Sequence, residues 1–109
     1  KDSQIINIGR SIIDTAQSIF YSGQGSKATL ELNVPDNIEN AQIIDNRELV
    51  FKLVTSVGTS DIVFFSSTVK LTTGLGCTSV CEVPRLASSG LKKVKLEVIS
   101  QDTVNIEVV

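Results

Sequence analysis

The chain contains 109 residues, of which 41% are hydrophobic and 20% are charged. This length corresponds to one globular domain, and the composition excludes an intrinsically disordered chain. The 10 basic and 12 acidic residues give a net charge of -2, without the basic excess that binds a phosphate backbone, so nucleic acid is not an expected partner. No apolar run approaches the roughly 20 residues of a transmembrane helix. We therefore expect a single domain over residues 1–109.

A helical period marks the beginning of the chain. Apolar residues recur at steps of three and four over residues 3–21, as on the buried face of an amphipathic helix. Asp2 or Ser3 can cap the first free backbone N–H groups, and Gly23 with Gly25 allows the chain to leave the helix. The sequence therefore predicts an amphipathic α-helix over residues 3–21.

After residue 27 the apolar residues follow a period of two, which is typical of β-strands. The expected strands occupy residues 28–34, 38–44, 49–54, 62–66, 68–72, a short stretch before 83, 94–98 and 104–108. About seven to eight short strands with frequent turns and no further helical pattern indicate a sandwich or a barrel. We predict a mainly β fold: an antiparallel β-sandwich over residues 27–109, led by one N-terminal amphipathic α-helix.

Turn-forming residues separate the expected strands. Asp45-Asn46 predicts one turn, Gln101-Asp102 predicts the turn of a C-terminal hairpin, and residues 56–60 around Gly58 are expected to form a break. Ser66-Ser67 fits a turn, a bulge or a crossover between two sheets. The strand order stays open at this stage.

The residue types argue against an enzyme. There is no histidine, so the commonest general base and the commonest metal ligand are both missing. Acidic residues such as Asp45 and Glu48 flank predicted turns, where carboxylates serve local hydrogen bonds. We therefore expect no catalytic residues, no cofactor-binding residues, no metal ligands and no cofactor.

Cys77 and Cys81 are the only cysteines. In a straight strand their Cα atoms would lie ~13 Å apart, whereas a disulfide spans ~4.4 to 6.8 Å, so a bond requires residues 78–80 to form a tight turn. Gly74 and Gly76 suit such a turn, and the bond would indicate an oxidising compartment. The alternative is a pair of buried, reduced thiols in a strand.

The helix carries the remaining candidate for an interaction surface. Ile5, Ile12, Ala16 and Ile19, together with Gly9, follow alternating steps of four and three, so they share one face of the helix. In one interpretation this face packs on the sandwich. In the other it contacts a partner helix or continues into a membrane segment, which predicts a stripe that is partly uncovered.

Three features occur together at the beginning of the chain: the helical segment over residues 16–21, the glycine step over residues 23–27, and a strand that closes at Pro35. In this combination the chain resembles archaeal proteins with a class III signal peptide, which are similar to type IV pilins. The resemblance implies a processed N-terminus, a hydrophobic helix for anchoring or filament packing, and a β-rich extracellular head. Since the chain begins at Lys1, we expect that the signal peptide and the most hydrophobic helical segment are absent here.

The leading hypothesis is a non-enzymatic, extracellular, pilin-like surface protein, which is membrane-anchored or filament-associated in its full-length form. Its expected partners are proteins, either its own subunits in a homo-oligomer or the cell-surface layer, and it meets a membrane only through the absent N-terminal segment. The alternative is a ligand- or carbohydrate-binding sandwich, which needs exposed aromatic platforms. Tyr21 is the only tyrosine, tryptophan is absent, and Phe51, Phe64 and Phe65 are expected in the core.

Overall fold

The computed structural model describes residues 2–74, 76–77, 79–83 and 85–109. The predicted helix is confirmed as α1 (Asp2–Tyr21), although the capping side chains expected at Asp2 or Ser3 lie outside the described part. Strands follow α1 along the chain: β1 (Lys27–Val34), β2 (Ile38–Ile44), β3 (Glu48–Thr55), β4 (Gly58–Phe65), β5 (Lys70–Thr73), β6 (Val80–Glu82), β7 (Gly90–Val98) and β8 (Thr103–Val108).

The strands form two four-stranded sheets, which confirms the predicted mainly β sandwich with one N-terminal helix. Sheet A has the order β1-β7-β8-β5, and sheet B has the order β4-β3-β2-β6. The described strand pairs are antiparallel except for β5 and β8, which run parallel. The predicted C-terminal hairpin is present as β7 and β8, with Leu96 opposite Ile106.

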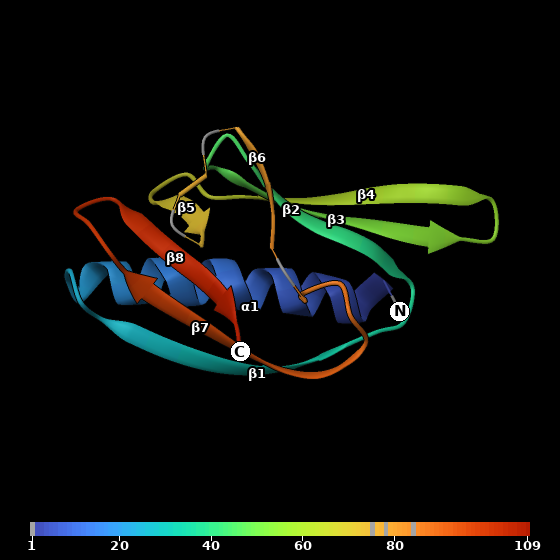
Figure 1. The fold of residues 1–109 in the computed structure, drawn as a ribbon, viewed down its shortest axis with the longest axis horizontal. Helices are drawn as coiled ribbons and strands as arrows, with labels where there is room; N and C mark the ends of the chain where they lie inside the picture. Colours follow the sequence, from blue (N-terminus) through green and yellow to red (C-terminus); the bar gives the residue numbers. More distant parts are fainter. Residues whose placement is uncertain (1, 75, 78, 84) are drawn as a thin grey trace.

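Helix α1 contributes to the same core as the two sheets. It contacts β1, β7 and β8 of sheet A and β4 of sheet B, and Figure 1 shows it running alongside the strands of sheet A. Because β1 and β4 are edge strands, the helix fills the side of the sandwich between these two edges. Each fully buried isoleucine of the helix stabilises the fold by roughly 1.5–3 kcal/mol.

The two-residue period predicts the inner faces of the strands correctly. Leu49, Phe51 and Leu53 of β3 are buried, as are Leu96 and Ile106 of sheet A. On β1 the burial alternates from one residue to the next, so one face of the strand is exposed to solvent, as expected. The core is therefore one continuous layer between the sheets, closed on one side by the helix.

The turn between β3 and β4 differs from the sequence-based expectation. The break expected over residues 56–60 is wrong beyond Val57, because β4 already begins at Gly58 and pairs with Thr55. Gly58 has a φ of 134°, and the Thr55 hydroxyl donates to its carbonyl at 2.9 Å, so a tight turn replaces the expected loop. The β3–β4 hairpin thus becomes longer, and in Figure 1 its loop end extends beyond the beginning of α1.

Ser66-Ser67 is the crossover between the sheets, one of the three alternatives that the sequence leaves open. The chain leaves sheet B after Phe65 and enters sheet A at Lys70, so the strand expected from residue 68 begins later. Ser66 is fully buried and its hydroxyl donates to the carbonyl of Val69 at 2.6 Å. This hydrogen bond satisfies a polar group at the point where the chain passes through the core.

Asn46 joins the two sheets on the side opposite α1. It lies in the predicted turn between β2 and β3, and its Nδ2 donates to the carbonyls of Leu71 (3.0 Å) and Cys77 (2.9 Å). The amide of Leu71 donates in return to the carbonyl of Asn46 at 2.7 Å. Asn46 has a φ of 59°, a left-handed conformation that asparagine adopts more readily than most residues.

We predict that Asn46→Gly lowers the free energy of unfolding by about 1–3 kcal/mol, because two side-chain hydrogen bonds to carbonyls are lost while the left-handed backbone stays favourable. Asn46→Ala should lose about 1–2 kcal/mol more, since alanine is strained at this φ. Urea denaturation of both variants measures the two contributions separately. Equal stability of Asn46→Gly and the unmodified chain would contradict the role of the side chain.

Gly9 allows α1 to approach sheet B closely. It is buried in the middle of the helix, and a Cβ atom at this position would overlap the ring of Phe64. That ring also meets Phe51 edge-on, with centroids 6.0 Å apart and an interplanar angle of 84°. The glycine is thus explained by the aromatic side chain that packs on it, despite its cost to the helix.

Gly9→Ala should lower the free energy of unfolding by about 1–3 kcal/mol through overpacking against Phe64, although alanine is the better helix former. Asp14→Ala, on the exposed side of the same helix, is the matched control and should leave stability within about 0.5 kcal/mol. Thermal or chemical unfolding provides the comparison. A stabilised Gly9→Ala variant would show that the Phe64 ring moves aside freely.

Candidate interaction surface

The structure places the predicted helix face in the core of the domain. Ile5, Ile12 and Ala16 have no exposed surface, and Ile19 is also buried. The interpretation in which this stripe packs on the sandwich therefore describes the structure. The expectation of a partly uncovered stripe does not hold for these four residues, because β1, β7, β8 and β4 cover them. No helix in the described part of the chain combines the length and apolar character that spanning a membrane requires.

Cys77 and Cys81 are joined by a disulfide, with Cα atoms 5.7 Å apart. Of the two alternatives left open by the sequence, the structure contains the bonded one. The turn expected over residues 78–80 includes Thr78, which lies outside the described residues. The amide of Asp45 donates to the carbonyl of Ser79 at 2.7 Å, so the bonded loop is attached to the β2–β3 turn.

We predict that the replacement of both cysteines by serine lowers the free energy of unfolding by only about 2 kcal/mol, because the closed loop is short. Mass spectrometry of the native chain with alkylating reagent should show no added mass before reduction and two labelled thiols after it. Two thiols that react in the unfolded but unreduced chain would contradict the disulfide.

The acidic residues form no candidate metal site. Within the described residues no group of three or more cysteine, aspartate or glutamate side chains could hold a metal ion. At Asp102 a hydrogen bond from the Thr103 hydroxyl (3.0 Å), aided by Lys70 at 3.5 Å, holds the pKa of the carboxyl below its ordinary value. The amide of Lys70 also donates to the Asp102 carbonyl at 2.7 Å, so these contacts fasten β5 to the β7–β8 turn.

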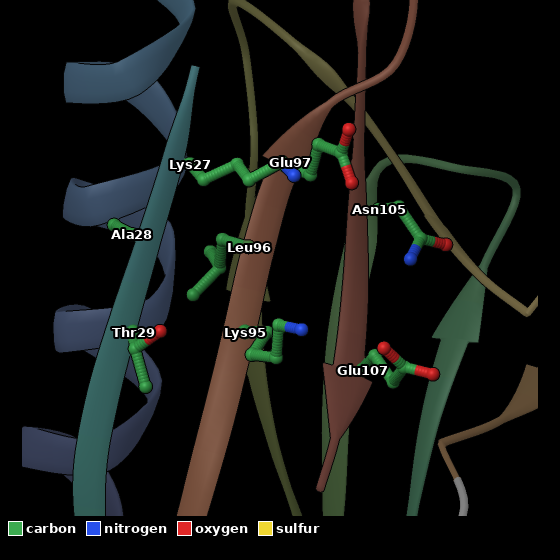
Figure 2. Close-up of a pocket in the computed structure, with 8 residues that line it drawn as sticks. All are labelled: Lys27, Ala28, Thr29, Lys95, Leu96, Glu97, Asn105 and Glu107. Atoms are coloured by element: carbon green, nitrogen blue, oxygen red, sulfur yellow. The ribbon is translucent and has the colours of Figure 1, made fainter. Parts of the chain in front are cut away.

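A shallow polar depression lies on the outer face of sheet A. Figure 2 shows its lining side chains on β1, β7 and β8: Lys27, Ala28, Thr29, Lys95, Leu96, Glu97, Asn105 and Glu107. Its volume is about 90 Å³, whereas ligand pockets usually occupy about 300–1,000 Å³. Each lysine stands opposite a glutamate, in the pairs Lys27–Glu97 and Lys95–Glu107. This arrangement is typical of a solvated sheet face.

The outer face of sheet B carries a group of apolar residues, which the sequence analysis did not foresee. The strand registers place one row across all four strands, formed by Phe65, Glu48, Ile44 and Val80. The adjacent row contains Val63 and Val50. We call the five apolar members of these rows (Ile44, Val50, Val63, Phe65 and Val80) the sheet B patch.

The patch is open to solvent at its margins. Phe65 is 61% exposed, Val63 51% and Val80 55%, while Val50 at the centre is buried. The expectation that Phe65 belongs to the core is therefore wrong, whereas Phe51 is buried and Phe64 is partly buried as expected. The alternation of a strand places Phe64 and Phe65 on opposite faces, so the sequence indicates that only one of them enters the core but not which one.

Charged residues border the patch. Glu48 and Glu82 lie within its two rows, and Lys52 stands opposite Asp61 in the next row. The Lys52–Asp61 pair is formally neutral, so the two glutamates give this face an acidic character. Exposed apolar groups with a polar border are typical of protein contact surfaces.

No protein-family model matches the chain, and no curated protein or solved structure matches it significantly. The fold and the surface features are therefore described from the residues of this chain alone.

Proposed function

We propose that the chain is the β-rich head of a non-enzymatic, extracytoplasmic, pilin-like surface protein, and that the sheet B patch is its protein contact surface. The observation that carries this proposal is the patch itself. Phe65 and Val63 expose apolar side chains on β4, and Val80 exposes another on β6 at the opposite edge of the same face, where an isolated domain would place polar residues.

The disulfide supports a location outside the cytoplasm. Bonds such as Cys77–Cys81 persist in oxidising compartments and are rare in cytosolic proteins. The likeness of residues 3–35 to archaeal class III signal-peptide proteins points the same way, because those proteins carry a β-rich head outside the cell.

The position of α1 fits a pilin-like head. The described helix is docked along the sandwich by its apolar stripe, so these residues hold the head together instead of contacting other subunits. The beginning of α1 lies at the periphery of the domain in Figure 1. A hydrophobic segment joined there would leave the domain without crossing the sandwich, and it would serve as the anchor or the filament core.

A test of the location uses intact cells that produce the full-length protein. Antibodies against residues 27–109 should label these cells equally before and after permeabilisation, because the head faces the outside. A cytoplasmic protein serves as the control and should be labelled only after permeabilisation. If the head shows the same behaviour as that control, the proposed function fails.

A further inference from the structure

Strand β4 is an edge of sheet B that no described strand covers, and α1 contacts its inner side through Phe64. It pairs with β3 on one side, and the sheet order places no strand on its other side. From residue 59 to 65, the described residues make no backbone hydrogen bond to β4 apart from those with β3. An edge of this kind presents free N–H and C=O groups to which another extended chain can bind.

The other sheet edges are protected. β6 is short, with bounds Val80–Glu82, and β5 is bonded by Asn46 through the amide and the carbonyl of Leu71. β1 carries Lys27 at its beginning and runs into Pro35 at its end. Lysine, proline, shortness and cover are the usual means by which proteins block edge pairing. β4 contains neither lysine nor proline and has the bounds Gly58–Phe65.

The side chains at this edge define the strand that would fit beside it. Ile62 and Phe64 face the inner side, and Val63 and Phe65 face the outer side, so residues 62–65 are apolar on both faces. The one charge on β4, Asp61, already stands opposite Lys52 of β3. A fitting partner strand must therefore be uncharged and apolar on both faces over the same length.

We propose that this edge pairs with β4 of a second copy of the chain, so that the two sheets B continue into one another. Residues 62–65 are themselves the densest apolar run of the sequence, which makes the edge complementary to itself. In an antiparallel pair with a two-fold axis near Val63 or Phe64, the apolar runs face each other and the two Asp61 carboxylates lie on opposite sides of the axis. This proposal rests on the proposed function and assigns a partner to the β4 edge, which borders the sheet B patch.

Analytical ultracentrifugation of the chain over a concentration series tests the pairing. We expect a reversible dimer whose dissociation constant rises at least about tenfold in Val63→Lys, because this substitution places a charge inside the apolar run that pairs. Thr59→Lys is the matched control: Thr59 is exposed on the same face of β4 but outside the apolar run. This variant should keep the dimer.

Val80→Lys separates edge pairing from packing of the outer faces. Val80 belongs to the sheet B patch but lies on β6, at the opposite edge of the sheet. Edge pairing predicts an unchanged dimer in this variant, and amide hydrogen exchange should show protection that rises with concentration in β4 alone. Thermal unfolding verifies that each variant is folded, which is expected because both valines are exposed.

Two results would overturn the proposal: a chain that stays monomeric up to about 1 mM, or a dimer that Val80→Lys disrupts as strongly as Val63→Lys. Neither result alters the surface labelling of intact cells. Failure of self-pairing is therefore distinguishable from failure of the proposed function.

Discussion

The burial of the α1 stripe between the two sheets is the contact on which the rest of this structure depends. Each sheet has one apolar inner face, and the edges β1 and β4 would leave that core open on one side. Ile5, Ile12 and Ala16 close this side, and Asn46 joins the sheets on the other side through its hydrogen bonds to Leu71 and Cys77. One closure is hydrophobic and the other is polar, so the sandwich is held by two different kinds of interaction.

These two closures determine which surfaces of the domain remain exposed. The apolar stripe of the helix is buried in the core among the described residues. On the outer face of sheet A, lysines stand opposite glutamates. The outer face of sheet B and its edge at β4 differ from both, because Val63 and Phe65 expose apolar side chains there. These exposed apolar side chains lie on the sheet that the helix contacts least.

The sequence predicted the architecture well because amphipathic periods report burial directly. The helix, the inner face of β3 and the β7–β8 hairpin follow from the spacing of residues such as Phe51 and Leu96. It failed where both faces of a strand are apolar, since Val63 and Phe65 carry the same residue types as the core and only pairing with β3 decides their direction. Residues 58–60 belong to β4 for a similar reason. Their composition is typical of a loop, but pairing with β3 stabilises them as a strand. The helix stripe could not be assigned at all from local pattern, because a covered and an uncovered stripe have the same period.

The pairing of β1 with β7 has a consequence for biosynthesis. Lys27 lies opposite Glu97, so β1 can pair with β7 only after nearly the whole chain has been synthesised. Contacts between residues so far apart in the sequence form slowly, because the entropic cost of closing a long loop precedes the stabilisation that the contacts provide. A ribosome therefore releases α1 and β1 well before sheet A can assemble around them.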